Sequence, residues 1–248
     1  VLVLKSGFAS DFALSRIRVN IDVFNSIDNF IYNDVIRRQK QLSPTKLIIV
    51  DLDNTLITVD SFKLFLLKWI INNKISSIFK IHLFIMIVFS KLLNLGDTNN
   101  KKLKEDLIKT CFLNTSIKEI ENFLLNFSNL LLKKINKKII NRIHYYQKKK
   151  YLICLATASP DFYVKKFASK LGIKKIISTK TLYNYNFFKI VGNNCKGIYK
   201  KKEILKSFPK INSYKTIFYT DDLIDLPVIN ICNINYIVSG NVIKKYKK

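Results

Sequence analysis

The segment LIIVDLDNTL, residues 47–56, begins with four apolar residues and then places two carboxylates two positions apart, at Asp51 and Asp53. A largely apolar run with little alternation is typical of a strand that is buried on both faces of a parallel sheet. In such sheets the ligand lies at the carboxyl ends of the strands. We therefore expect Asp51 and Asp53 to leave a buried strand at a functional site.

Three later segments resemble this opening run: YLICLATASP at 151–160, KTIFYTDDLIDLP at 215–227 and INYIVSG at 234–240. Helical stretches lie between them, for example residues 162–171, which end before Gly172. Alternating strands and helices of this kind predict an α/β fold with a doubly wound parallel sheet.

The spacing of the predicted strands is uneven, because about 100 residues separate Asp53 from Thr157, whereas one crossover helix needs far fewer. The excess predicts an insertion. We expect an N-terminal helical extension at 1–44, a catalytic core made of 45–59 and 141–248, and a helical cap at 60–140.

The predicted cap contains apolar stretches at 62–71 and 75–95. Amphipathic helices are expected around 103–112 and 117–140. The repeat of Val23, Ile27, Ile31 and Val35 predicts one more amphipathic helix in the extension.

The chain carries 43 basic and 17 acidic residues, a net charge of +26 over 248 residues. Such a charge favours nucleic acid, an anionic membrane surface or a phosphorylated substrate as partner. The lysines are spread along the whole chain, and Asn and Ile are also abundant, which an AT-rich genome would produce through its codons. No RNA-binding motif, zinc spacing or basic zipper occurs. Both interpretations of the charge stay open.

The four cysteines, Cys111, Cys154, Cys195 and Cys232, form no CxxC pair. A disulfide scaffold is therefore not expected, and a reducing compartment is. Asp11 interrupts the apolar start of the chain, so no standard signal peptide is predicted. We expect a cytoplasmic location, with peripheral attachment to the inner face of a membrane as the alternative.

Acids and a hydroxyl gather where the predicted strands end: Asp51, Asp53, Thr157, Asp221, Asp222 and Asp225. Converging carboxylates repel one another and need a cation, and hard oxygen ligands favour Mg²⁺. A nearby basic side chain and hydroxyl would suit a phosphate group. Such a set supports phosphoryl transfer to a carboxylate nucleophile.

These residues resemble the motifs of the haloacid dehalogenase-like (HAD) superfamily of phosphohydrolases. The four motifs occur in the family's order over about residues 46–240, and four in order are far more specific than any one alone. They are DxDxT at Asp51–Thr55, Thr157 in LATASP, Lys200 in NCKGIYK, and Asp221 with Asp225 in YTDDLIDLP.

The resemblance implies a role for each position. Asp51 would be the nucleophile, and Asp53 would protonate the leaving alcohol and then deprotonate water. Thr157 and the amide of Ala158 would hold phosphoryl oxygens, and Lys200 would neutralise their charge.

The resemblance also implies a Mg²⁺ site. The carboxylates of Asp51 and Asp221 and the backbone carbonyl of Asp53 would bind the ion. Asp225 would orient these ligands from behind or bind through water.

The chain departs from the family pattern at two points. Asn54 occupies a position where Gly or Ser is common in the family. Thr220 occupies a position where Gly is common. Asn tolerates unusual backbone angles, so we expect the turn at Asn54 to survive. Lys200 is selected from three consecutive lysines by its spacing from Gly197. Ser159, just before Pro160, is expected to cap the following helix.

The position of the insertion resembles that of the C1-capped branch that includes phosphoserine phosphatase. The sequences in and around the motifs most resemble those of subfamily IB, which also includes a bacterial phosphatidylglycerophosphatase. The apolar stretch 75–96 could be a buried pair of cap helices, a segment that docks on a membrane, or a span. Lys80 and Lys91 at its flanks favour anionic lipid.

We therefore expect a Mg²⁺-dependent phosphomonoesterase with an aspartyl-phosphate intermediate, acting on a lipid head-group phosphate such as phosphatidylglycerophosphate. One alternative is a soluble phosphatase of phosphoserine type, although residues 59–62 lack the Glu or Arg that would grip an amino acid. Another is a basic nucleic-acid-binding protein with an inactive core. The intact motifs argue against that alternative.

Overall fold

The computed structural model describes residues 46–72, 97–184 and 187–247, and for 97–100 only the helical backbone. The described residues all belong to one compact unit. The helix predicted within 1–44 and the apolar stretch 75–96 lie outside the described residues. The division into extension, core and cap stays a prediction.

Within the described residues, seven strands form one sheet in the order β4-β3-β2-β1-β5-β6-β7. The inner strands from β3 to β6 run parallel, and β4 and β7 join the edges antiparallel. This confirms the predicted doubly wound α/β fold. The strands are β1 Lys46–Val50, β2 Leu152–Pro160, β3 Lys175–Asn184, β4 Phe187–Val191, β5 Lys215–Thr220, β6 Ile234–Ser239 and β7 Val242–Tyr246.

Strand β1 lies at the centre of the sheet and is sealed on both faces. Ile48 and Val50 pack into one apolar cluster, and Leu47 and Ile49 pack into a second. All four side chains are fully buried, and burial of such a side chain stabilises the fold by about 1.5–3 kcal/mol. The unbroken apolar run before Asp51 is thus explained by two layers of cover.

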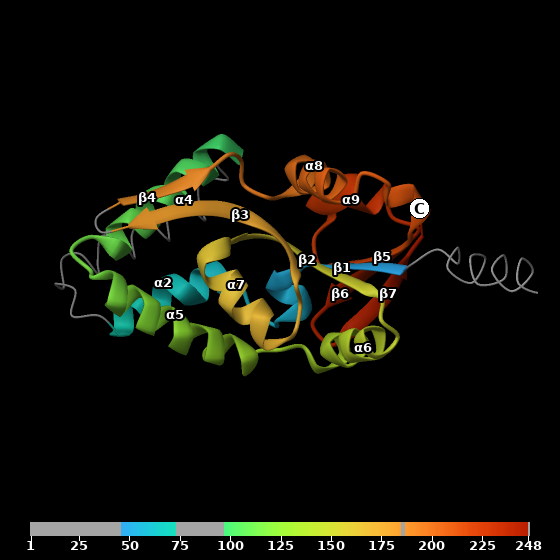
Figure 1. Cartoon of the computed structure of the whole chain (residues 1–248), viewed down its shortest axis with the longest axis horizontal. Helices are drawn as coiled ribbons and strands as arrows, with labels where there is room; N and C mark the ends of the chain where they lie inside the picture. Colours follow the sequence, from blue (N-terminus) through green and yellow to red (C-terminus); the bar gives the residue numbers. More distant parts are fainter. Residues whose placement is uncertain (1–45, 73–96, 185–186, 248) are drawn as a thin grey trace, which may run out of the picture. The chain divides into compact units, whose positions relative to one another are not determined.

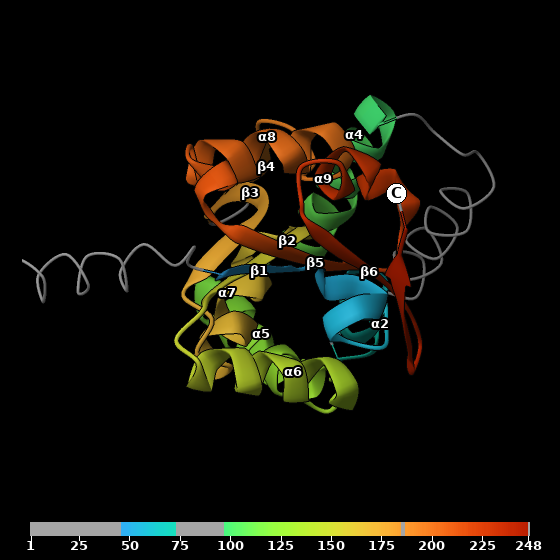
Figure 2. The same cartoon turned by 90° about the vertical axis from the view of Figure 1, so that its right-hand side faces the viewer.

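Helices lie on both faces of the sheet, with α8 and α9 on one side and α5, α6 and α7 on the other (Figure 2). The helices are α2 Ser61–Asn72, α4 Asp97–Phe112, α5 Ile117–Leu132, α6 Lys137–Lys148, α7 Asp161–Lys170, α8 Gly197–Ser207 and α9 Leu226–Ile229, with short 3-10 turns at Ile211–Ser213 and Leu223–Asp225.

The single helix expected at 117–140 is wrong, because α5 ends before Asn136 and α6 begins after it. The Asn136 side chain accepts hydrogen bonds from the backbone N–H groups of Lys138 and Ile139 at 3.1 and 3.4 Å. This is a helix N-cap, which starts a new helix at that point. Helix α6 then packs on the sheet through the buried side chains of Ile139 and Ile143.

Strands β3, β4 and β7 were not predicted. Strand β3 continues past the core and pairs with β4, and this hairpin lies beside α4 (Figure 1). The carboxylate of Glu105 in α4 accepts a hydrogen bond from the backbone N–H of Ile190 at 2.8 Å. Phe188 and Ile190 are buried, whereas their neighbours in β4 are exposed. The short alternating pattern of β4 gave a weaker signal than the apolar runs of the inner strands.

An aromatic cluster joins α2, α5 and α7. The ring of Phe65 in α2 stacks on Tyr163 in α7 with 5.8 Å between centroids. It also meets Phe123 and Phe127 of α5 edge-on, each at 5.7 Å. These contacts hold the start of α2 against the core.

None of the helices in the described ranges is long and apolar enough to cross a membrane.

Candidate active site

Asp51 lies at the carboxyl end of β1. Its backbone N–H still pairs with the carbonyl of Tyr219 in β5, at 2.9 Å. One carboxylate oxygen accepts from the N–H of Leu52 at 2.7 Å, and the other lies 3.0 Å from Nζ of Lys200. Asn54 in the following turn has a φ of 50°, which confirms that Asn takes the unusual backbone angle there.

Lys200 is a fully buried cation between two carboxylates. Besides Asp51, its ammonium group contacts Asp225, which is also buried. Gly197 starts α8 with a φ of 54° and donates its N–H to Asp225 at 2.9 Å. One helical turn separates Gly197 from Lys200, so both groups reach the same carboxylate. Lys200 is therefore the lysine of the triplet that meets Asp51, whereas Lys202 covers the Tyr199 ring.

The pKa values of this group reflect burial and mutual attraction. Burial raises the pKa of Asp51 to about 7, although the nearby Lys200 ammonium opposes this shift. Burial acts to lower the pKa of Lys200, but Asp51 and Asp225 outweigh it, and the net effect is a raised pKa. Lys200 thus stays charged over the whole physiological range.

Asp53 is held by two serines. Oδ1 accepts from the backbone N–H of Ser61 at 2.7 Å, and Oδ2 accepts from the hydroxyl of Ser159 at 2.6 Å. The two hydroxyls lie 2.9 Å apart, and that of Ser61 lies 3.0 Å from the Tyr163 hydroxyl. Burial raises the pKa of Asp53, against the opposing effect of the Ser159 and Ser61 hydrogen bonds.

The expected role of Ser159 as a helix cap is wrong. Pro160 stands at the N-cap of α7, and no side chain caps that helix. The Ser159 hydroxyl instead points back to Asp53, because the pairing of β2 with β3 is irregular between Ala156 and Pro160. An irregularity of this kind re-aims the side chains at a strand end.

Thr157 and Ala158 lie in this irregular stretch. The fully buried Thr157 accepts a hydrogen bond at Oγ1 from the N–H of Ser159, at 3.0 Å. The carbonyl of Ala158 accepts from the hydroxyl of Thr179 at 2.7 Å and from Nζ of Lys104 at 3.1 Å.

Asp221 follows β5 and lies against the turn after β1. Its carboxylate accepts from the Asn54 side-chain amide at 3.2 Å and from the Thr55 hydroxyl at 3.4 Å. Burial raises its pKa. Asp222 pairs with Lys196 at 3.3 Å near the surface, and its carboxylate accepts from the N–H of Ile224 in the following turn.

The predicted Mg²⁺ ligands are hard oxygen donors, which fit that ion. Both side-chain hydrogen bonds of Asp221 come from neutral groups, and among the described residues no cation is bonded to its carboxylate. In the described ranges no three His, Cys, Asp or Glu side chains form a ready-made metal cluster; the predicted set also uses the Asp53 carbonyl. The carboxylate of Asp225 accepts a hydrogen bond from the N–H of Gly197 and pairs with the ammonium group of Lys200. The ligand set stays a prediction.

Several polar residues near these motifs were not singled out from the sequence. They lie on different elements and meet only in the fold: Ser61, Lys104, Tyr163, Thr179 and Asn194. No motif marks them, and only their position next to a predicted strand end could have drawn attention to any of them.

The sequence model of a haloacid dehalogenase-like hydrolase matches residues 48–230, which include every residue of this site. The chain belongs to the haloacid dehalogenase-like hydrolase family. The family membership predicted from the four motifs is thereby confirmed, and so is the prediction of an enzyme.

Several solved structures share the fold. A protein of unknown function from Bordetella pertussis Tohama I has 15% identity and a TM-score of 0.68, over 78% of this chain and 89% of that one. A phospho-aspartyl intermediate analogue of phosphoserine phosphatase has 14% identity and a TM-score of 0.52, over 78% and 86%. Cytosolic 5'-nucleotidase IIIB bound to cytidine has 10% identity and a TM-score of 0.53, over 79% and 71%. A comparison with curated proteins finds no match.

Proposed function

We propose that this HAD hydrolase is a Mg²⁺-dependent phosphomonoesterase that works through an aspartyl-phosphate on Asp51. The observation that carries the proposal is the contact of Asp51 with the buried Lys200, at 3.0 Å. A carboxylate beside a fixed cation is placed to meet an anionic phosphoryl group, because the cation offsets the repulsion between them. The phosphoserine phosphatases among the structural neighbours support the same reaction class.

In the first half-reaction, a carboxylate oxygen of Asp51 attacks phosphorus. The bond from that oxygen to phosphorus forms as the bond from phosphorus to the ester oxygen breaks. The protonated Asp53 gives its proton to the departing alcohol oxygen. Burial raises the pKa of Asp53, which favours the protonated form that this step requires.

In the second half-reaction, ionised Asp53 accepts a proton from water while the water oxygen attacks phosphorus. The bond between phosphorus and Asp51 breaks, which releases inorganic phosphate and restores the carboxylate. Lys200, the Thr157 hydroxyl and the Ala158 amide would hold the phosphoryl oxygens in both steps.

Mg²⁺ would be held by the carboxylates of Asp51 and Asp221 and the carbonyl of Asp53, with Asp225 supporting from behind. When bound, the ion neutralises charge on the phosphoryl group.

For the substrate, we propose a lipid head-group phosphate such as phosphatidylglycerophosphate. The net charge of +26 supports an anionic membrane surface as the place of action. A soluble phosphorylated metabolite is the alternative, and the phosphoserine phosphatases of the same fold favour that one. Neither needs nucleic acid as a partner.

The test measures inorganic phosphate released from phosphatidylglycerophosphate in mixed micelles, from phosphoserine and from p-nitrophenyl phosphate, with Mg²⁺ or with EDTA. Asp51→Asn should abolish release, and Asp106→Asn, which removes the same charge from α4, should not. Acid quenching during turnover of a ³²P-labelled substrate should leave label on the parent chain but not on Asp51→Asn. Release that is equal in the Asp51→Asn variant, or equal in EDTA, would refute the mechanism.

A further inference from the structure

Lys104 in α4 reaches across to the end of β2. Its ammonium group donates to the carbonyl of Ala158 and to the side-chain oxygen of Asn194, each at 3.1 Å. It also lies over the ring of Phe62, 5.1 Å from the centroid. The ammonium group thus has two neutral hydrogen-bond acceptors and one aromatic ring as partners, each on a different segment of the chain.

The surroundings of Lys104 are closed into a network by Thr179. The Thr179 hydroxyl is placed to donate to the same two acceptors, Ala158 at 2.7 Å and Asn194 at 3.0 Å, and it accepts from the N–H of Cys195 at 3.0 Å. Thr179 is fully buried. A network in which each member is satisfied holds its parts rigidly. The carbonyl of Ala158 is therefore held between two donors, Lys104 and Thr179.

The peptide group that carries this carbonyl also carries the N–H of Ser159. That N–H donates to Oγ1 of Thr157. Hydrogen bonds to a peptide carbonyl polarise the N–H of the same peptide. Because Oγ1 of Thr157 accepts this bond, its own proton must point elsewhere, and no described residue accepts it. The hydroxyl is left free to donate to a ligand.

We propose that Lys104 is a positioning residue that fixes the Ala158–Ser159 peptide and thereby aims the Thr157 hydroxyl at the transferred phosphoryl group. This inference rests on the proposed phosphatase function. It gives α4, a helix of the inserted region, a direct part in phosphate binding through the backbone of β2.

The protonation of Lys104 provides a second test of its proposed positioning role. Burial lowers the pKa of Lys104 to about 8, against the nearby Asp53 and Asp60, while Lys196 adds to the lowering and Cys195 opposes it. The ammonium form, with three donors, therefore prevails below about pH 8 and is lost above it. Phosphate binding should weaken over the same range.

The experiment compares the parent chain with Lys104→Met, Lys104→Arg and the control Lys102→Met, which changes an exposed lysine of the same helix. Calorimetry with inorganic phosphate and Mg²⁺ measures binding, and p-nitrophenyl phosphate measures kcat and KM. We expect Lys104→Met to weaken phosphate binding and lower kcat by about tenfold each, the effect of one lost charged hydrogen bond. Lys102→Met should match the parent.

Lys104→Arg keeps a positive charge at every pH and should restore most of the binding. Its binding should no longer weaken between pH 7.5 and 9, unlike that of the parent. If Lys104→Met fails to fold, the difference in pH profile between the parent chain and Lys104→Arg tests the inference instead. A folded Lys104→Met with parental phosphate affinity and kcat would overturn the inference, as would identical pH profiles for the parent and Lys104→Arg.

The two proposals fail in different ways. A parent chain that binds phosphate but hydrolyses no ester would refute the proposed function. The phosphate affinities of the Lys104 variants would still test the role of Lys104. A parent chain that does neither would refute both.

Discussion

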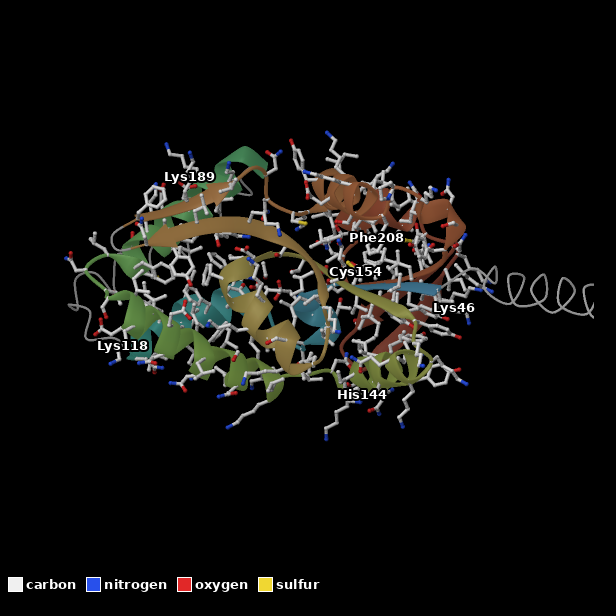
Figure 3. All side chains as sticks on the ribbon, viewed as in Figure 1. Lys46, Lys118, His144, Cys154, Lys189 and Phe208 are labelled. Carbon is white, nitrogen blue, oxygen red and sulfur yellow. The ribbon has the colours of Figure 1, made fainter. Side chains whose placement is uncertain are left out.

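The ammonium group of Lys200 lies 3.0 Å from the carboxylate of Asp51 and also contacts Asp225, so one buried cation serves two buried acids. Asp51 follows β1, Lys200 lies in α8 and Asp225 ends the 3-10 turn after β5, so three segments far apart in the chain meet here. Figure 3 shows side chains filling the space between the elements of the core. The cation therefore couples the stability of the core to the chemistry of Asp51.

Replacing Lys200 by Met should destabilise the fold and abolish turnover. Removal of one partner leaves two carboxylates buried without their cation, which costs about 3–5 kcal/mol. Urea unfolding at pH 7.5 measures the loss. Lys206→Met, on the exposed face of the same helix, should change stability by no more than about 0.5 kcal/mol. Equal midpoints for both variants would show that Lys200 does not balance the two acids.

Gly197 should resist substitution more than Gly240, although both have positive φ angles, 54° and 56°. Alanine at either position pays about 1–2 kcal/mol for the left-handed backbone. A Cβ at Gly197 would also lie 3.1 Å from the carbonyl oxygen of Ile224, whereas a Cβ at Gly240 would have no atom of the described residues within 4 Å. The midpoint temperature of thermal unfolding should therefore be lower for Gly197→Ala than for Gly240→Ala. The reverse order would contradict the tight approach of α8 to this loop.

Ser159→Ala should alter the pH dependence of turnover. The Ser159 hydroxyl stabilises the ionised form of Asp53, so it lowers the pKa of that carboxyl. Without it the pKa rises further, and the limb of the pH–rate profile that belongs to Asp53 should move to higher pH. We expect kcat to fall about tenfold, equal to about 1.4 kcal/mol.

The control for this prediction is Ser169→Ala, which removes an exposed hydroxyl at the far end of α7. Its profile should superimpose on that of the parent. A Ser159→Ala profile that also superimposes would separate Ser159 from proton transfer.

The buried thiols should be inert in the native state. Burial raises the pKa of Cys154 and of Cys195 to about 12, and that of Cys111 further still. Because the thiolate is the reactive form, Ellman's reagent at pH 8 should label these residues only after unfolding in guanidinium chloride. Rapid labelling of the native chain would mean that these side chains are more open than the structure places them.

Much of the fold could be predicted because its signals are local. The runs ending at Asp51, Thr157 and Thr220 are buried on both faces and need continuous apolar side chains, which is visible in any window of the sequence. Strands β3, β4 and β7 lie toward or at the edges of the sheet, carry mixed side chains and gave no such signal. The cap at Asn136 is also a local feature, yet the apolar pattern that continues on both sides of it concealed the break.

The candidate site was predicted in part for the same reason. Asp51, Asp53, Thr157 and Asp221 all follow apolar runs, so position alone marked them. Lys200 needed the spacing from Gly197, and the structure places it as that spacing indicates.

By itself the sequence determined which strands are buried, their doubly wound arrangement and the acids at their ends, since apolar periodicity and short motifs are properties of neighbouring residues. Only the tertiary structure decided that Ser159 and Ser61 hold Asp53, and that Lys104 and Thr179 fix Ala158. These bonds join side-chain and backbone groups of different segments, and the residues are ordinary in their local context. Their partners are chosen by how the elements pack, and packing is a property of the whole fold.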